Sequence, residues 1–237
     1  MTNPVAFLNH LRSEGYHPRS DKHSNSLARA ILDDLVRHCP KLREKARLGM
    51  LVYALNTVLM AGTSEWNVDL VLGPPSLDTV APPEGTAILE EVPSTIEIAI
   101  EIKSVMTEHR KAVKNRKRDL EAHHEHVHNY NNRAVAGGVF VLNASGAFQS
   151  PLRPQVSVHR DPKRLVEHCI AELRAVSARG GMKGYGLEAK CAIVVNLDNR
   201  NLGTADYVTE PPAPAVGDPL HYDAFIRSLC ENYTARF

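Results

Sequence analysis

Two neighbouring segments of this sequence have the pattern of β-strands, and they restrict the fold more than any other feature. The first, 66–73, carries Asp69 among apolar residues, and the second, 95–103, ends in Glu101-Ile102-Lys103. Side chains of a strand alternate between its two faces. In the second segment we therefore expect Ile96, Ile98, Ile100 and Ile102 on one face, and Glu97, Ala99, Glu101 and Lys103 on the other. Two carboxylates and an ammonium group can then meet at the ends of adjacent strands.

The other segments predict an α/β fold with a central mixed sheet flanked by helices, in one domain that covers residues 1–237. Helices are expected from a cap at Ser24-Asn25-Ser26 to about Arg47, from Thr107 to about Asn129, from about Pro162 to Ala178, and from Tyr222 to Tyr233. Further strands are expected at Ala134–Leu142 and Cys191–Leu197, whereas Met50–Met60 fits either a helix or a strand.

Glycine and proline indicate the irregular parts of the chain. Gly137-Gly138, inside an expected strand, indicates a bulge or a close backbone approach. The stretches Pro74–Pro93 and Gly203–Pro219 predict loops. We expect residues 203–237 to form a proline-rich segment and a closing helix that pack on the rest of the domain.

Composition excludes several classes of protein without identifying a partner. Hydrophobic residues make up 43% and charged residues 23% of the chain, as in ordinary globular proteins. There is no apolar run of the roughly 20 residues that cross a bilayer and no secretory signal, so we expect a cytoplasmic protein without a membrane partner. Cys39, Cys169, Cys191 and Cys230 form no Cys-x-x-Cys pair, which predicts buried free thiols and argues against zinc. The net charge is +1, so nucleic-acid binding would require a local basic surface.

Asp69, Glu101 and Lys103 are the candidate catalytic residues. Carboxylate oxygens are preferred ligands of Mg²⁺, and phosphodiester hydrolysis requires an activated water and a stabilised transition state. Asp69 and Glu101 would bind the metal together with the backbone carbonyl of Ile102, and Mn²⁺ could substitute for Mg²⁺. Lys103 could orient the water or neutralise developing charge.

Other interpretations of these residues stay open. An ion pair between Glu101 and Lys103 on a solvated sheet would explain both residues without catalysis. Asp78 could replace Asp69, although the neighbouring prolines indicate a loop. Glu97 is expected on the same face as Glu101, as a solvated strand residue. A second Glu-x-Lys, Glu188-Ala189-Lys190, begins a strand and is interpreted as structural.

The spacing resembles the PD-(D/E)xK nuclease superfamily, which has the restriction-endonuclease-like fold. The resemblance rests on Asp69, on Glu101-Ile102-Lys103 and on the polar, basic helix that follows, and it covers about residues 24–143. It implies that Asp69 and Glu101 bind Mg²⁺ and that Lys103 assists the attacking water. Val68 stands where the superfamily motif has a proline. An acid of the first helix often joins the site in this superfamily, and Asp34 is the candidate here.

The helix after Lys103 is expected to contact nucleic acid. A narrow apolar seam of Met106, Val113, Leu120 and Val127 would face the core. The basic residues expected to contact phosphates are Arg110, Lys111, Lys114, Lys117 and Arg118. Three of them, Arg110, Lys114 and Arg118, recur every four residues and would form one row on the helix surface.

Four histidines crowd the end of the same helix: His123, His124, His126 and His128. His124 and His128 are four residues apart and could bind a metal, but no third ligand is evident. We therefore expect a solvated helix end or one that contacts bases. His109 could act as an auxiliary base.

Together these features predict a Mg²⁺-dependent endonuclease of the type II restriction kind, which cleaves double-stranded DNA in restriction or phage defence. If both strands are cut at a symmetric site, the resemblance implies a homodimer with one active site per strand, and a restriction enzyme would be accompanied by a DNA methyltransferase encoded nearby. Two alternatives remain: a structure-specific DNA repair nuclease with the same chemistry, and a catalytically inactive DNA-binding module of the same fold. An RNA substrate also stays open.

Overall fold

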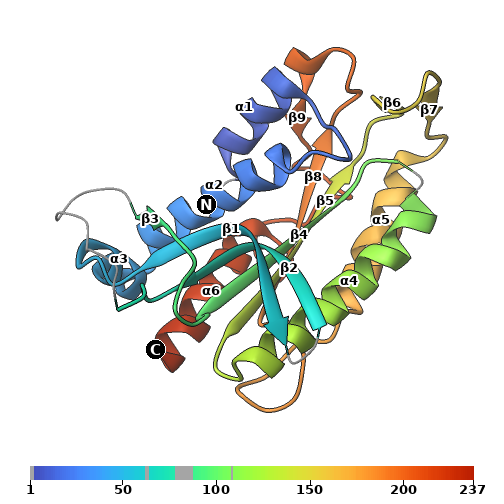
Figure 1. Ribbon diagram of the computed structural model, residues 1–237. Coiled ribbons are helices and arrows are strands. Elements are labelled where there is room, and N and C mark those ends of the chain that lie inside the picture. Colours follow the sequence, from blue (N-terminus) through green and yellow to red (C-terminus); the bar gives the residue numbers. More distant parts are fainter. Residues whose placement is uncertain (1–2, 62–63, 78–87, 108) are drawn as a thin grey trace.

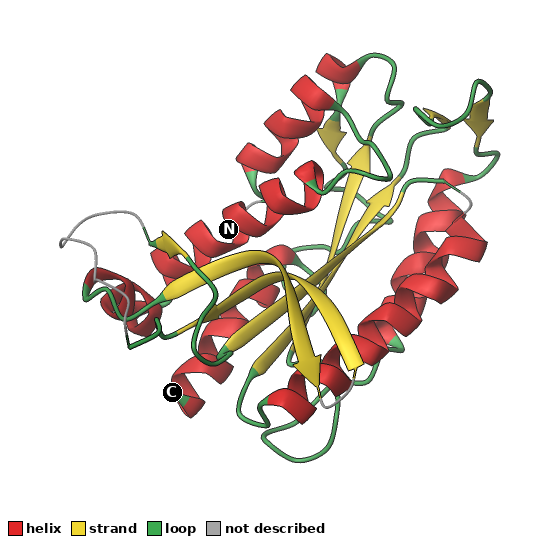
Figure 2. Ribbon diagram, in the orientation of Figure 1, coloured by secondary structure: helices red, strands yellow, loops and turns green. Residues whose placement is uncertain are grey.

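A mixed β-sheet with helices on both faces forms the centre of the computed structural model, which describes residues 3–61, 64–77, 88–107 and 109–237 (Figures 1 and 2). Within these residues the sheet has seven strands in the order β3-β1-β2-β4-β5-β8-β9. Their bounds are Val52–Ala61 (β1), Ser64–Gly73 (β2), Leu89–Glu90 (β3), Ile98–Val105 (β4), Val135–Asn143 (β5), Ala189–Asn196 (β8) and Asp206–Tyr207 (β9). A separate pair, Ala147–Gln149 (β6) and Val156–Val158 (β7), lies beyond the end of β5.

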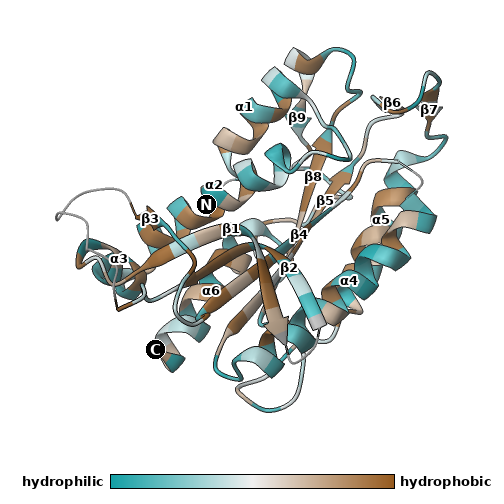
Figure 3. Ribbon diagram, viewed as in Figure 1, coloured by the Kyte–Doolittle hydropathy of each residue, from teal (hydrophilic) through white to brown (hydrophobic). Residues whose placement is uncertain are grey.

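The sheet divides the apolar core into two clusters, one under each layer of helices. One face packs against helices α1 (Val5–Glu14), α2 (Lys22–His38), α3 (Pro40–Arg47) and α6 (Tyr222–Arg236). The other packs against α4 (His109–Tyr130) and α5 (Pro162–Arg174). Figure 3 shows the apolar strands of the central sheet between these two layers of helices. None of the described helices is both long enough and apolar enough to cross a membrane.

Strands β2 and β4 pair over a short stretch and then separate. They are antiparallel, and their register runs from Leu70 opposite Ile100 to Leu72 opposite Ile98. β2 continues instead as a long hairpin with β1, which curves away from the sheet (Figure 1). The segment of β4 after Ile100 therefore has β5 on one side and no paired strand on the other. This opening positions the candidate site described below.

Parallel strands β4, β5 and β8 form the middle of the sheet, and α4 and α5 connect them. The register between β4 and β5 is continuous from Ile98 opposite Val135 to Val105 opposite Leu142, so Gly137-Gly138 forms no bulge. Both glycines instead allow close packing. A Cβ atom on Gly137 would lie 3.2 Å from Phe225 of α6, and one on Gly138 would lie 2.7 Å from Leu187. These neighbours are side chains, so the close approach is of side chains to the glycines and not of another backbone.

Replacement of Gly138 by alanine is expected to destabilise the fold by about 1–3 kcal/mol, because the added methyl group overpacks a core site between Leu187 and Leu120. Urea unfolding followed by circular dichroism measures this change. Gly146→Ala is the matched control, since no atom lies within 4 Å of a Cβ built there. Equal stability of the two variants would contradict the packing argument.

The helical boundaries differ from expectation in the first third of the chain. The expected helix from Ser24 to Arg47 is two helices, because Pro40 disfavours helical geometry at Cys39 and begins α3. The first of them begins at Lys22, so Ser24 is not its cap. Helix α1 was not anticipated, since only Phe7, Leu8 and Leu11 of its residues are buried. The ambiguous segment Met50–Met60 is strand β1.

Elsewhere the described elements follow the expectations, with shifts at their ends. The expected strands at 66–73, 134–142 and 191–197 are confirmed as β2, β5 and β8, and the helices near 162 and 222 as α5 and α6. Short strands β3 and β9 lie within the two expected loops. Met106 precedes α4 and packs in the opposite cluster from Val113, Leu120 and Val127, so it does not belong to the helical seam. The four cysteines are free thiols, and Cys230 is half-buried while the other three are buried.

Candidate active site

The side chain of Asp69 bridges the two strands at the point where they separate. It is half-buried on β2, and its Oδ2 accepts a hydrogen bond of 2.7 Å from the backbone N–H of Ile102 on β4. The N–H and C=O groups of one strand residue point to the same side. The carbonyl of Ile102 therefore also points toward β2, on the side where β4 has no paired strand. Asp69, Glu101 and the backbone of Ile102 are thus adjacent.

A local distortion of β1 accompanies this separation. Asn56 lies between the residues of β1 that pair with Val68 and Leu70, and it has a left-handed backbone with φ of 47°. Asparagine tolerates this conformation better than most residues. Its side chain donates a 2.8 Å hydrogen bond to Asn25, which ties the hairpin to the first turn of α2. The beginning of α2 is thereby held beside Asp69.

Burial raises the pKa of Asp69, and the negative charge of Asp21 adds to this increase. The Ile102 amide, Lys103 and the Ser24 hydroxyl lower the pKa but do not outweigh burial. The acid near α2 that acts on Asp69 is therefore Asp21, the residue that precedes this helix. Asp34 instead accepts a hydrogen bond from Tyr222 and pairs with Arg37, so its predicted place in the site is wrong. Asp34 lies more than three turns along α2 from Asp21, so it cannot reach the same point.

Glu101 is almost completely buried, with 1% of its surface exposed, and it is incompletely paired. One carboxylate oxygen forms an ion pair with Lys103, while Oε2 has no hydrogen-bond partner among the described residues. Burial, followed by the negative charge of Asp69, raises the pKa of Glu101 to about 8. An oxygen in this position can accept a further cation, which would favour the ionised carboxylate.

His123 lies behind Glu101 but does not neutralise it. Its Nδ1 is 3.9 Å from Glu101 and accepts a 3.3 Å hydrogen bond from the indole N–H of Trp66. Complete burial lowers the pKa of His123 to about 3, so the ring is neutral at physiological pH. Trp66 also stacks on His126, with ring centroids 4.9 Å apart. His123 therefore gives Oε2 of Glu101 neither a hydrogen bond nor a positive charge.

Lys103 carries its positive charge at neutral pH. Burial acts to lower its pKa, but the carboxylates of Glu101 and Asp69 outweigh this effect and raise the pKa above the ordinary value. The ammonium group can therefore hold an anion or donate hydrogen bonds, and it is not suited to act as a base. An ion pair on a solvated surface does not describe these residues, because Glu101 is buried and the side chain of Lys103 is only 23% exposed.

The donor set at this opening fits Mg²⁺. Mg²⁺ commonly binds through one or two carboxylates, and water and substrate phosphate complete its octahedral shell. Asp69, Glu101 and the carbonyl of Ile102 would supply the protein ligands, and the unpartnered Oε2 of Glu101 leaves one oxygen free for this purpose. Within the described part of the chain, no three His, Cys, Asp or Glu side chains form a ready-made metal-binding group.

The raised pKa of Glu101 predicts how stability depends on pH. Its value of about 8 in the folded protein lies above the ordinary 4.5, so the contribution of this group to stability is present below about pH 4.5 and is lost as the pH rises through about 8. Without metal, the unfolding temperature of the wild type should therefore fall relative to that of Glu101→Gln as the pH rises over this range. Added Mg²⁺ should stabilise the wild type increasingly with pH and leave Glu101→Gln unaffected. An identical pH profile of the two proteins would contradict the assignment.

The other acidic candidates lie elsewhere. Glu97 faces the opposite side of the sheet from Glu101, because β4 begins at Ile98 and the residues before it do not continue the alternation. It is buried and binds Lys45 at 3.0 Å and the Tyr233 hydroxyl at 2.7 Å, so the expectation of a solvated residue is wrong. Ile96 likewise packs in the other cluster from Ile98. Asp78 lies outside the described residues.

The basic residues of α4 divide into two groups. Arg110, Lys111, Lys114 and Arg118 are exposed, as contact with a phosphate backbone would require. Lys117 instead is half-buried and pairs with Glu172 of α5 at 3.4 Å and with Glu121 at 3.9 Å, so it is less accessible than the other four.

The histidines of α4 are mostly buried, and the expected solvated helix end is wrong. His123, His124 and His128 lie on the same side of the helix as Leu120 and Val127, and burial lowers the pKa of each ring. His109 is also buried, and its Nε2 is 2.8 Å from the carbonyl of Asn143. It lies against His159 rather than against Glu101.

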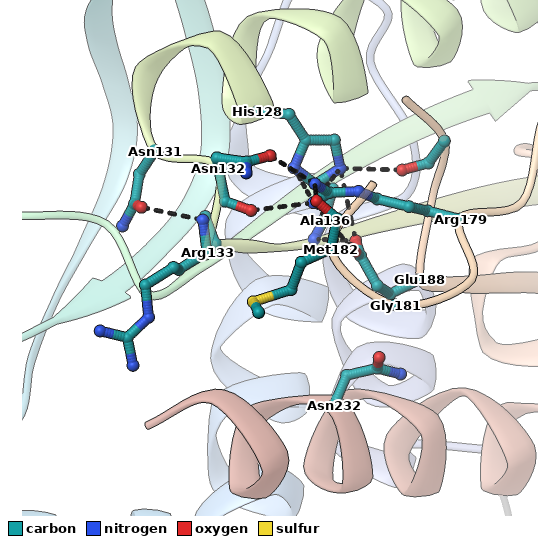
Figure 4. A network of polar contacts seen from close by, with 12 residues as sticks. His128, Asn131, Asn132, Arg133, Ala136, Arg179, Gly181, Met182, Glu188 and Asn232 are labelled. Carbon is teal, nitrogen blue, oxygen red and sulfur yellow. Dashed lines mark hydrogen bonds and ion pairs between the residues drawn. The ribbon is translucent and has the colours of Figure 1, made fainter. Parts of the chain in front are cut away.

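The second Glu-x-Lys forms no local ion pair. The side chain of Glu188 is completely buried and forms ion pairs with Arg236 at 2.8 Å and with Arg179 at 3.3 Å. It also accepts a 2.7 Å hydrogen bond from the backbone N–H of Ala136, and Figure 4 shows Glu188 together with Arg179 and Ala136. His128 also contacts this carboxylate, at 3.6 Å. Lys190 donates to the carbonyls of Arg174 and Val176 at the end of α5. Both residues therefore hold the fold together.

Asn56, Trp66 and His123 support the site but were not singled out as its residues from the sequence. A non-glycine residue with a left-handed backbone gives no local signal in a strand of apolar neighbours. The place of His123 depends on the orientation of α4 against β4, which the spacing of the histidines alone does not specify.

Comparison with known proteins identifies no relative. No protein-family model matches the chain, and neither the curated proteins nor the solved structures contain a match.

Proposed function

We propose that this protein is a Mg²⁺-dependent endonuclease with a restriction-endonuclease-like core, which hydrolyses phosphodiester bonds of double-stranded DNA. The observation that carries the proposal is the meeting of Asp69, Glu101 and Lys103 where β2 and β4 separate. This arrangement matches the resemblance to the PD-(D/E)xK superfamily in the order, spacing and charge of the residues. The exposed basic residues of α4 give the DNA backbone a surface beside this opening.

Each residue has a distinct task in the proposed reaction. Asp69, Glu101 and the Ile102 carbonyl would hold Mg²⁺, which would supply Lewis-acid chemistry for activating a water and offsetting charge on the phosphate. Lys103 holds its ammonium group beside the attacking water and stabilises the negative charge that develops on the phosphate. The hydrogen bond from Ile102 fixes the orientation of Asp69, and the neutral His123 leaves Oε2 of Glu101 without a hydrogen bond, so that this oxygen can serve as a metal ligand.

We further propose that the enzyme acts in the cytoplasm, in restriction or phage defence. Cleavage of both strands at a symmetric site would require a homodimer with one site per strand. A DNA methyltransferase encoded nearby would then protect the host DNA.

Cleavage of unmethylated phage DNA and of methylated genomic DNA in the presence of Mg²⁺ tests the proposal. The wild type should produce discrete fragments from unmethylated DNA, and Asp69→Asn should produce none. The matched control is Glu65→Gln, an exposed acid of the same strand, which should cleave like the wild type. Equal cleavage by wild type and Asp69→Asn would reject this centre. Cleavage that follows branched structures rather than sequence would favour the repair nuclease. Binding without cleavage by folded wild type would favour the inactive module.

A further inference from the structure

A pocket with a volume of about 350 Å³ lies at the carboxyl end of β4, directly after Lys103. Its lining residues belong to the end of β4 and the residues after it (Ser104 to Thr107), to the beginning of α4, and to the segments around Tyr16 and Ser150. This volume falls in the lower part of the range for small-ligand sites, which is about 300–1,000 Å³. The role proposed for the catalytic residues does not use this pocket.

The lining of the pocket combines cations with apolar surface. Lys111, Arg116 and Arg153 contribute positive charge, and none of the lining residues that the structure describes carries a carboxylate. Tyr16 is buried against Phe148, with ring centroids 6.1 Å apart, and both rings line the pocket. Such a lining suits a ligand with one anionic end and one flat apolar part.

Nε of Arg116 is buried at this pocket without a hydrogen-bond partner among the described residues. Oγ of Ser104 is also buried there, and it lies against the Tyr16 hydroxyl without a hydrogen bond of normal geometry. Unpaired buried polar groups are uncommon and require an explanation such as a bound ligand. Tyr16 connects them. Burial raises the pKa of its hydroxyl, and Arg116 and Ser104 both act in the opposite direction, so the three side chains are electrostatic neighbours.

The pocket is also coupled to the candidate catalytic centre. Arg116 pairs with Asp119 at 3.1 Å, and Asp119 lies one turn of α4 before His123, whose Nδ1 is 3.9 Å from Glu101. Ser104 follows Lys103 on the same strand. A ligand bound at Arg116 would therefore lie next to a phosphate positioned at Lys103.

We infer that this pocket holds one nucleotide of the substrate strand next to the phosphodiester that is cut. Its phosphate lies at Arg116 and Lys111, and its base packs on the side lined by Tyr16. This inference rests on the proposed function, because it assigns the neighbouring nucleotide of the same substrate. It also implies that the nucleotide leaves the base stack, since the pocket accepts a single unit.

Binding of thymidine 5′-monophosphate to the metal-free protein, measured by isothermal titration calorimetry, tests the inference. Thymidine and inorganic phosphate serve as the two part-ligands. The monophosphate should bind at least about tenfold more tightly than either part, and Arg116→Gln should weaken it by about tenfold or more, the effect of losing a hydrogen bond to a charged group. Ala112→Leu fills the same pocket without changing its charge and should also weaken binding.

Arg37→Gln is the matched control, because Arg37 also forms an ion pair with an acid three residues away but lies outside the pocket. It should bind the monophosphate like the wild type. Equal losses in Arg37→Gln and Arg116→Gln, equal affinity for phosphate and monophosphate, or no binding at all would each overturn the inference. Circular dichroism establishes that every variant is folded.

Glu101→Gln separates this inference from the proposed function. It should retain monophosphate binding while losing DNA cleavage. If the wild type cleaves DNA through Glu101 and binds no monophosphate, the pocket assignment fails and the nuclease stands. If the monophosphate binds and no DNA is cleaved under any condition, the nuclease fails and the nucleotide pocket stands.

Discussion

Lys103→Met is expected to lower the rate constant of DNA cleavage by about 10²- to 10³-fold while Mg²⁺ still binds. The substitution keeps the length of the side chain and removes the ammonium group that stabilises developing charge, and losses of this size follow the removal of one such group. Lys103 is not a proposed metal ligand, so the stabilisation of the fold by Mg²⁺ should persist. Single-turnover cleavage and thermal unfolding with and without Mg²⁺ measure the two quantities.

Glu101→Gln is the variant with which Lys103→Met is compared, because it removes a proposed metal ligand instead of a charge that acts on the substrate. Glutamine keeps the shape of the side chain but loses the charge that would hold the metal, so both cleavage and stabilisation by Mg²⁺ should disappear. Glu65→Gln, on the exposed surface of β2, should change neither. If Lys103→Met abolished stabilisation by Mg²⁺ as well, the lysine would hold the metal site together rather than act on the substrate. Full cleavage by Lys103→Met would contradict its catalytic role.

The sequence predicts the residues of the candidate site better than it predicts their surroundings. Asp69 and Glu101 were expected together because each follows from the pattern of its own strand, and their meeting requires only that the two strands be neighbours. Glu97 shows the limit of this argument. Alternation predicts a shared face with Glu101 only where the strand is continuous, and β4 begins one residue after Glu97. The bend before Ile98 sends Glu97 to Lys45 and Tyr233 on the other side.

The fold was predicted where local patterns decide it and missed where contacts between distant residues decide it. The strands 134–142 and 191–197 are apolar runs that are buried on both faces, and such runs can be recognised as strands from the sequence alone. The burial of the histidines of α4 cannot be recognised in this way. His-His-Glu-His-Val-His suggests a polar helix end, but Arg179 and Glu188 from a later part of the chain surround His128, and Trp66 from an earlier part contacts His123. No local pattern contains these partners.

Glu188→Leu is expected to destabilise the protein by about 3–5 kcal/mol, the effect of removing one partner from a buried ion pair. Leucine fits the apolar surroundings, but it leaves the guanidinium groups of Arg179 and Arg236 buried beside His128 without their anion. Urea unfolding measures the change. Glu44→Leu removes an acid from an exposed ion pair with Arg47 and should leave the unfolding midpoint almost unchanged.

The double variant Glu188→Leu/Arg179→Leu tests whether the loss comes from the uncompensated charge. It should be less unstable than the sum of the two single variants, because each substitution alone leaves a charged group unpaired. Strict additivity would contradict this explanation and indicate that packing dominates. The glutamates of the two Glu-x-Lys sequences should thus differ in their effects on cleavage and on stability. Substitution of Glu101 should remove cleavage and stabilise the metal-free fold at neutral pH, because the Glu101 carboxylate is incompletely paired. Substitution of Glu188 should destabilise the fold without acting on the reaction, because two arginines hold the Glu188 carboxylate.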